Sequence, residues 1–132
     1  MSNSVATGVA YADPEFTTCY ASQEIGYAAA AQGAVTQATS KSTGVTLNTS
    51  AGQITMNNAS LGATTNVTFT LTNNLLSAKD VIILNVTSGT SGSYNAFVSS
   101  MTAGSATITL RNISASPLSE AVVINYAIIH CA

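Results

Sequence analysis

Residues 66–72 read Asn-Val-Thr-Phe-Thr-Leu-Thr, a stretch in which apolar and polar side chains alternate without interruption. Val67, Phe69 and Leu71 would share one face, and three threonines would share the other. Successive side chains of a β-strand point to opposite faces, so this pattern predicts a strand with one buried face. Threonine also suits a strand, because its branched Cβ packs well on a pleated surface.

Two stretches nearer the C-terminus extend the β pattern. Residues 106–111 alternate in the same way, whereas residues 121–129 are apolar on both faces apart from Asn125. The short run at 81–84 is also apolar on both faces. Such a strand lies in the centre of a sheet, or its second face is covered by a neighbouring subunit. The sequence leaves both explanations open.

Further short candidate strands give a total of about eight. They occupy residues 34–39, 44–48, 53–57, 80–87 and 94–101, and polar turn-forming stretches separate them. Short strands with polar turns predict an all-β fold, specifically an antiparallel β-sandwich, over residues 34–132. Eight strands in two packed sheets is also the number found in a jelly roll.

Residues 1–33 have a different texture, because no alternating pattern is sustained there. A short helix over 21–32 is disfavoured by Gly26, since glycine in a helix interior costs about 1 kcal/mol. We therefore predict an extended N-terminal arm. Its aromatic side chains, which are the candidate anchors for a binding partner, are Tyr11, Phe16, Tyr20 and Tyr27.

The composition excludes several classes of function. Only three basic and five acidic residues occur among 132, whereas charged residues make up about 25 % of an ordinary domain. Three scattered cations cannot neutralise a run of phosphates or hold an anionic membrane surface, so we expect neither nucleic-acid nor membrane binding. The apolar runs are too short to span a bilayer, and residues 1–20 lack the pattern of a secretory signal. So little charge also gives weak protection against self-association, which favours an assembly.

No motif for catalysis or metal binding is present. The two cysteines, Cys19 and Cys131, and the single histidine, His130, are fewer than the four ligands of a structural zinc site. We expect free thiols, although a disulfide between the two cysteines stays open. No sequence context marks a nucleophile beside His130, and the acids Asp80 and Glu120 are expected at a strand start and in a loop. The sequence therefore predicts a non-enzymatic protein without a cofactor.

A resemblance to a known family rests on several longer stretches. They are GVAYADPEF at 8–16, QATSKSTGVTLN at 37–48, GQITMNNASL at 52–61, VTFTLTNNLLSAKDVIILNVTSGTSGSYN at 67–95 and ATITLRNISASPLSEAVVINYAIIH at 106–130. Together they resemble a small all-β module of tailed-bacteriophage virions. This module occurs in capsid decoration proteins, also called cement or head-fibre proteins, and in some tail-fibre proteins.

The resemblance implies a structural protein of the virion that acts as a homotrimer. It would be assembled in the host cytoplasm and would bind the major capsid protein on the outer capsid surface through residues 1–33. We expect the sandwich core and part of the trimer seam to come from two strands, represented by Val81, Ile83, Val122, Ile124, Tyr126 and Ile128.

The resemblance also leaves a second function open, a receptor- or glycan-binding knob on a tail fibre. In that case a surface glycan would bind at loop tips or subunit clefts, through an exposed tyrosine such as Tyr94.

Overall fold

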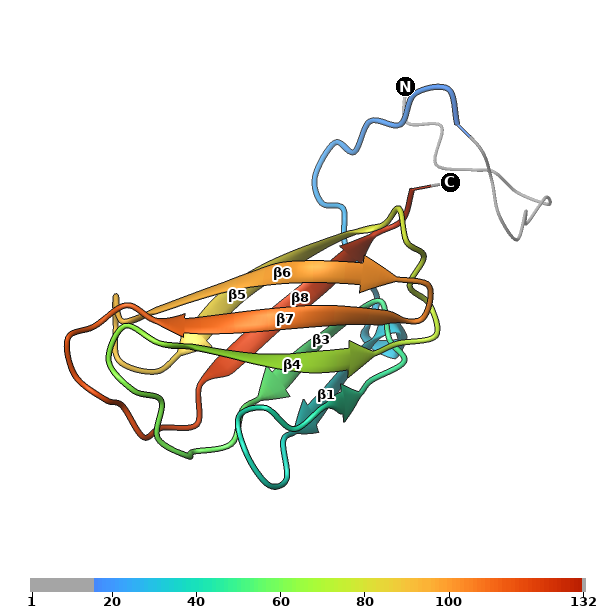
Figure 1. Cartoon of the computed structure of the whole chain (residues 1–132). Helices are drawn as coiled ribbons and strands as arrows, with labels where there is room; N and C mark the ends of the chain where they lie inside the picture. Colours follow the sequence, from blue (N-terminus) through green and yellow to red (C-terminus); the bar gives the residue numbers. More distant parts are fainter. Residues whose placement is uncertain (1–15, 132) are drawn as a thin grey trace.

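A computed structural model describes residues 16–131, in which eight strands form two packed sheets (Figure 1). Sheet A has the strand order β1-β3-β8-β5, with β1 at Gln32–Thr36, β3 at Ala51–Thr55, β8 at Val123–Ile129 and β5 at Val81–Ser88. Sheet B has the order β2-β4-β7-β6, with β2 at Val45–Thr46, β4 at Asn66–Thr72, β7 at Ser105–Asn112 and β6 at Tyr94–Thr102. The only helical element in this part of the chain is η1 (Ala29–Ala31), a single 3-10 turn before β1. The predicted all-β sandwich is confirmed, and each predicted stretch overlaps one strand.

Each sheet contains one parallel pair, which the sequence did not predict. β1 pairs with β3 and β2 pairs with β4 in parallel, while the four other pairings are antiparallel. The chain passes from β1 in sheet A to β2 in sheet B and then back to β3 in sheet A. Because of these two crossings, β3 lies beside β1 and runs in the same direction. Because the two pairs break an all-antiparallel arrangement, the jelly-roll description is not confirmed, and β-sandwich is the appropriate term.

The core lies between the inward faces of the two sheets. Phe69 and Leu71 point inward from β4, and Ile108 and Leu110 point inward from the neighbouring β7. Sheet A contributes the predicted core residues Ile124, Tyr126 and Ile128 of β8, which are all buried. Val122, which directly precedes β8, is buried as well. β8 lies between β3 and β5, so a central position explains its apolar character.

Val81 and Ile83 do not belong to this core, so of the two roles expected for this strand, core and seam, these two residues retain only the seam as a prediction. About half of each side chain is exposed, 50 % for Val81 and 52 % for Ile83, while Ile82 between them is buried. Both faces of this run are apolar, so its sequence alone did not show which face turns inward. β5 is moreover an outer strand of sheet A, so a central position does not explain its apolar outer face.

Buried polar side chains tie the loops to the sandwich. The amide of the fully buried Asn112 donates to the carbonyl groups of Leu61, Gly62 and Ser116 at 2.9–3.1 Å. The ammonium group of Lys41, which is also buried, donates to the carbonyl oxygen atoms of Asn57 at 2.5 Å and of Glu120 at 2.6 Å. Desolvation lowers the pKa of Lys41, against a smaller opposite effect of the Glu120 carboxylate. These contacts fix long loops without any need for regular structure.

Candidate functional site

The described part of the arm leaves the sandwich at the start of β1 and extends away from it (Figure 1). Residues 16–28 contain no helix or strand. The exposed fraction is 68 % for Phe16, 92 % for Tyr20 and 87 % for Ile25. Large apolar side chains that lie so open on an extended segment are typical of a segment that binds a partner. The fourth predicted anchor, Tyr11, lies outside the described residues.

Tyr27 has a different role from Phe16 and Tyr20. Its hydroxyl group donates a hydrogen bond to the carbonyl oxygen of Ile128, near the end of β8. The side-chain amide of Gln32 donates to the carbonyl oxygen of Tyr27 at 2.9 Å. Tyr27 therefore fixes the base of the arm to sheet A and is only partly available to a partner.

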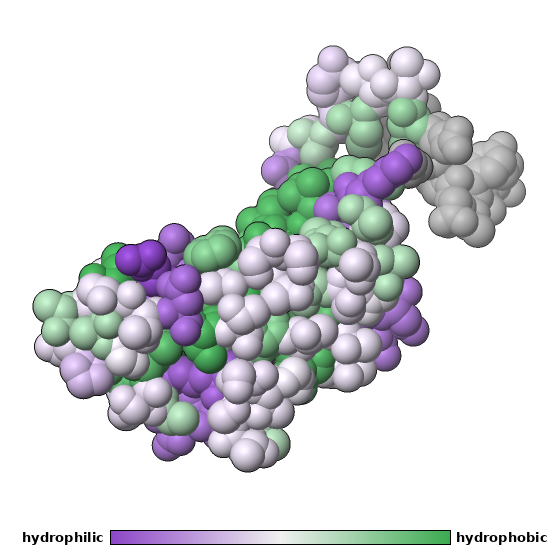
Figure 2. All heavy atoms as spheres, viewed as in Figure 1, coloured by the Kyte–Doolittle hydropathy of each residue, from purple (hydrophilic) through white to green (hydrophobic). Residues whose placement is uncertain are grey.

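An apolar patch lies on the outer face of sheet A beside the base of the arm. We call it the β5–β8 patch and define it as Val81, Ile83 and Ile129, each about half exposed. The strand register places Val81 opposite Ile129 and Ile83 opposite Ala127, so these side chains are direct neighbours. Figure 2 shows apolar surface gathered where the sandwich meets the arm.

The patch continues into a groove of about 590 Å³ between the arm and sheet A. One wall comes from the arm, with Ile25 and Tyr27, and the other from the sheet, with Ile83 and Ile129. His130 lies at one end, and none of the lining residues within 16–131 is Asp, Glu, Lys or Arg. The groove can therefore bind apolar groups but offers no charge to select an ionic ligand.

His130 belongs to a structural cluster around Asp80. The His130 ring nitrogen Nδ1 lies 3.0 Å from Asp80 Oδ2, and the Cys131 amide donates to Asp80 Oδ1 at 2.9 Å. The amide and hydroxyl groups of Ser77 also donate to this carboxylate, each at 2.9 Å. The backbone donors of Ser77 and Cys131, in that order of effect, hold the pKa of Asp80 well below its usual range. The cluster ties the end of β8 to the turn before β5.

This geometry does not form a catalytic triad. The Ser77 hydroxyl group contacts Asp80 and not the histidine, and Cys131 reaches Asp80 through its backbone amide. Asp80 directly precedes β5, which agrees with the expected position at a strand start. Glu120 has separate partners, since its Oε1 accepts a hydrogen bond from the Thr90 amide at 2.8 Å. The backbone hydrogen bond from Thr90 is the main cause of the lowered pKa of Glu120.

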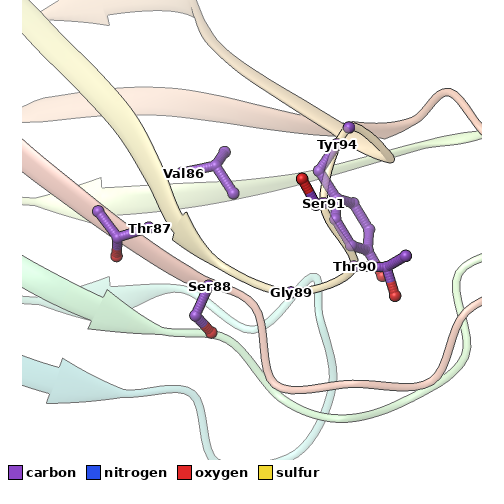
Figure 3. Close-up of a pocket in the computed structure, with 8 residues that line it drawn as sticks. Val86, Thr87, Ser88, Gly89, Thr90, Ser91 and Tyr94 are labelled. Carbon is purple, nitrogen blue, oxygen red and sulfur yellow. The ribbon is translucent and has the colours of Figure 1, made fainter.

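A smaller pocket of about 280 Å³ lies in the loop between β5 and β6. Thr87, Ser88, Thr90 and Ser91 line it, and the loop curves around the ring of Tyr94 (Figure 3). The Tyr94 hydroxyl group is buried and has no hydrogen-bond partner with acceptable geometry. Burial, together with the nearby Glu120 carboxylate, raises the pKa of Tyr94 to about 12. The expectation of an exposed tyrosine at this position is therefore wrong.

Chemistry-bearing side chains are sparse over residues 16–131. In this range no three His, Cys, Asp or Glu side chains gather in a way that could hold a metal ion. Cys19 and Cys131 are both exposed and carry free thiols. In the same range no helix is long and apolar enough to cross a membrane.

Comparisons with models of protein families, with curated proteins and with solved structures found no match for this chain.

The sequence interpretation missed two residues of the groove, Ile25 and Ile129. Ile25 is a single apolar residue in the arm and carries no periodic signal. Ile129 was included in a run that is apolar on both faces, and only the register with β5 reveals that it lies beside Val81 on the outer face.

Proposed function

We propose that the protein is a non-enzymatic decoration protein of a bacteriophage capsid, which binds the outer shell as a homotrimer through its N-terminal arm. Its place is then the outer surface of the virion, and its partner is the major capsid protein. The proposal combines the resemblance of the sequence to phage virion modules with one structural observation. That observation is an arm with exposed Phe16 and Tyr20 that extends from a sandwich of very low charge.

The mechanism would be mechanical. An arm that packs apolar side chains into the shell adds contact area across capsid subunits, worth about 25 cal/mol for each Å² of apolar surface removed from water. Opening the shell then requires these contacts to be broken as well. Three arms on one trimer also raise the effective concentration of one another at the surface, so a weak contact per arm gives firm overall binding.

The sharpest test replaces the two exposed aromatic anchors while it leaves Tyr27 and the sandwich intact. Phe16→Ala combined with Tyr20→Ala is mixed with undecorated capsids, and co-sedimentation measures the bound fraction. We expect a loss of apparent affinity of at least about tenfold, since truncation of one buried aromatic anchor typically costs more than 1 kcal/mol. The matched control is Phe97→Ala, because Phe97 is an exposed aromatic residue that belongs to β6 of the sandwich and not to the arm. Undiminished binding of the double variant would refute the assignment of the arm.

The second candidate function is a receptor- or glycan-binding knob of a tail fibre. The pocket beside Tyr94 favours it, because threonine and serine side chains with free rotation of their hydroxyl groups line that pocket next to the tyrosine ring. Copy number separates the two functions: hundreds of copies per virion indicate decoration of the shell, and a handful indicate a fibre. A glycan-binding screen of the intact protein, with Thr90→Ala and Ser91→Ala as the comparison variants, tests the pocket directly.

A further inference from the structure

We propose that the β5–β8 patch is the seam at which copies of this chain pack on one another. Val81, Ile83 and Ile129 of each copy would pack against a second copy, with three patches meeting around a threefold axis. The inference deepens the proposed function and rests on it for the number of copies and for the shared direction of the arms.

The first argument is the state of the outer strands. β5 ends sheet A, and no other strand within residues 16–131 pairs with its free edge. Natural proteins protect such edges with charges, prolines or β-bulges. β6, which ends sheet B, has a bulge between Val98 and Ser100 in the middle of the strand. β5 also has a register shift, but near its end, between Val86 and Ser88. From Val81 to Val86 it keeps a continuous register and contains neither a charged residue nor a proline. A strand edge without these protections, beside an apolar outer face, is expected to be covered.

The second argument concerns the chemistry of the cover. The lining of the groove includes no Asp, Glu, Lys or Arg, so a partner selected by charge gains nothing there. The surface of the partner that covers the patch has to be apolar and nearly uncharged. The β5–β8 patch of a second copy of this chain is itself such a surface. A second copy therefore satisfies the requirement without any further partner.

The third argument is continuity with the contact between arm and sandwich. Ile25 and Tyr27 line the same groove as Ile83 and Ile129, and Tyr27 is bonded to the end of β8. Copies that meet through the β5–β8 patch therefore bring the bases of their arms close to the shared axis. All arms then leave the assembly at one end, which is the arrangement that simultaneous binding to one shell requires.

The test introduces one charge into the patch. Ile83→Lys places an ammonium group at the seam, where like charges of two or three copies would face each other in an apolar contact. We expect the concentration at which the assembly dissociates to rise by about a hundredfold or more, as measured by sedimentation velocity. Phe97→Lys is the matched control, because it puts the same charge on a partly exposed apolar position of β6, an outer strand of sheet B. An assembly that persists in Ile83→Lys, or that dissociates equally in both variants, would overturn the seam.

A cross-linking experiment keeps the proposal testable even if the charged variant does not fold. Ile83→Cys is prepared with both native cysteines replaced by serine, and a short thiol-specific cross-linker is added. Linked copies are expected for Ile83→Cys and not for Phe97→Cys in the same background. If Cys19 is then restored and the cross-link forms within one chain instead, the chain's own arm covers the patch and the seam is wrong. Shell binding is measured separately, so an assembly that binds capsids but has another seam leaves the proposed function standing.

Discussion

At the scale of single residues, the carboxylate of Asp80 connects two distant parts of the chain. It accepts hydrogen bonds from Ser77 and Cys131 and contacts His130, and these backbone donors hold its pKa below the usual range. A carboxylate whose pKa is lower in the folded state contributes stability above its unfolded pKa of about 3.9 and loses it as the pH falls further. The His130 contact was not apparent from the sequence, because residues 80 and 130 are brought together only by the pairing of β5 with β8.

We therefore expect Asp80→Asn to change the acid sensitivity of the fold. The natural protein should lose unfolding free energy as the pH falls from about 5 to 2, whereas the variant should be less stable at pH 7 and lose less over that range. Urea unfolding at a series of pH values measures both effects. Glu24→Gln, which changes an exposed acid of the arm, should leave the profile unchanged. Parallel profiles for Asp80→Asn and the natural protein would contradict this role of Asp80.

Asn112 gives a second prediction at this scale. Asn112→Ala removes a fully buried side chain whose amide donates to three loop carbonyl groups and whose Oδ1 accepts from the Ser114 amide at 2.9 Å. We expect a loss of about 2–4 kcal/mol in the free energy of unfolding, since several hydrogen bonds of one buried side chain are lost together and a cavity is left in their place. Asn95→Ala, at an exposed position of β6, should change the free energy by less than about 0.5 kcal/mol. Equal stability of the two variants would show that Asn112 does not hold the loop.

At the scale of elements, the alternating pattern predicted the existence and position of the strands but not their partners. Val67, Phe69 and Leu71 recur with a strict period of two, so the local sequence was sufficient to predict this strand. The parallel pairs at β1 and β2 depend on the path of the chain between the sheets, and no local pattern records that path. The same limit explains why the sequence did not show which side of β5 turns inward: a run that is apolar on both faces gives the alternation but not its direction.

The joint between arm and sandwich gives a prediction at the same scale. Tyr27→Phe removes the hydrogen bond to Ile128 but keeps the ring, so we expect the base of the arm to loosen by about 1 kcal/mol. Hydrogen exchange of the backbone amides from 24 to 31 should become faster, while exchange in β4 and β7 stays the same. Tyr20→Phe is the control, because its side chain is almost fully exposed. If both variants exchange alike, Tyr27 does not fix the arm.

At the scale of the whole molecule, the scarcity of charge connects the fold with the proposed assembly. Eight charged residues in 132 leave a chain rich in Ser, Thr and Asn, and within the sandwich the β5–β8 patch gathers three half-exposed apolar side chains that can take part in association. Interactions between exposed charges are screened at high salt, whereas apolar contacts are not weakened and sulfate strengthens them. We expect the assembly to dissociate at the same concentration in about 0.05 M and 1 M sodium chloride, and at a lower concentration in sodium sulfate. Sedimentation equilibrium in the three solutions measures the protein concentration at which the assembly dissociates. The variant Ile83→Lys is measured in parallel, as an example of a patch whose association depends on salt because it carries charge. If the natural assembly dissociates at a clearly higher protein concentration in about 1 M sodium chloride than in about 0.05 M, charged groups hold it together. The β5–β8 patch would then lose its role as the seam.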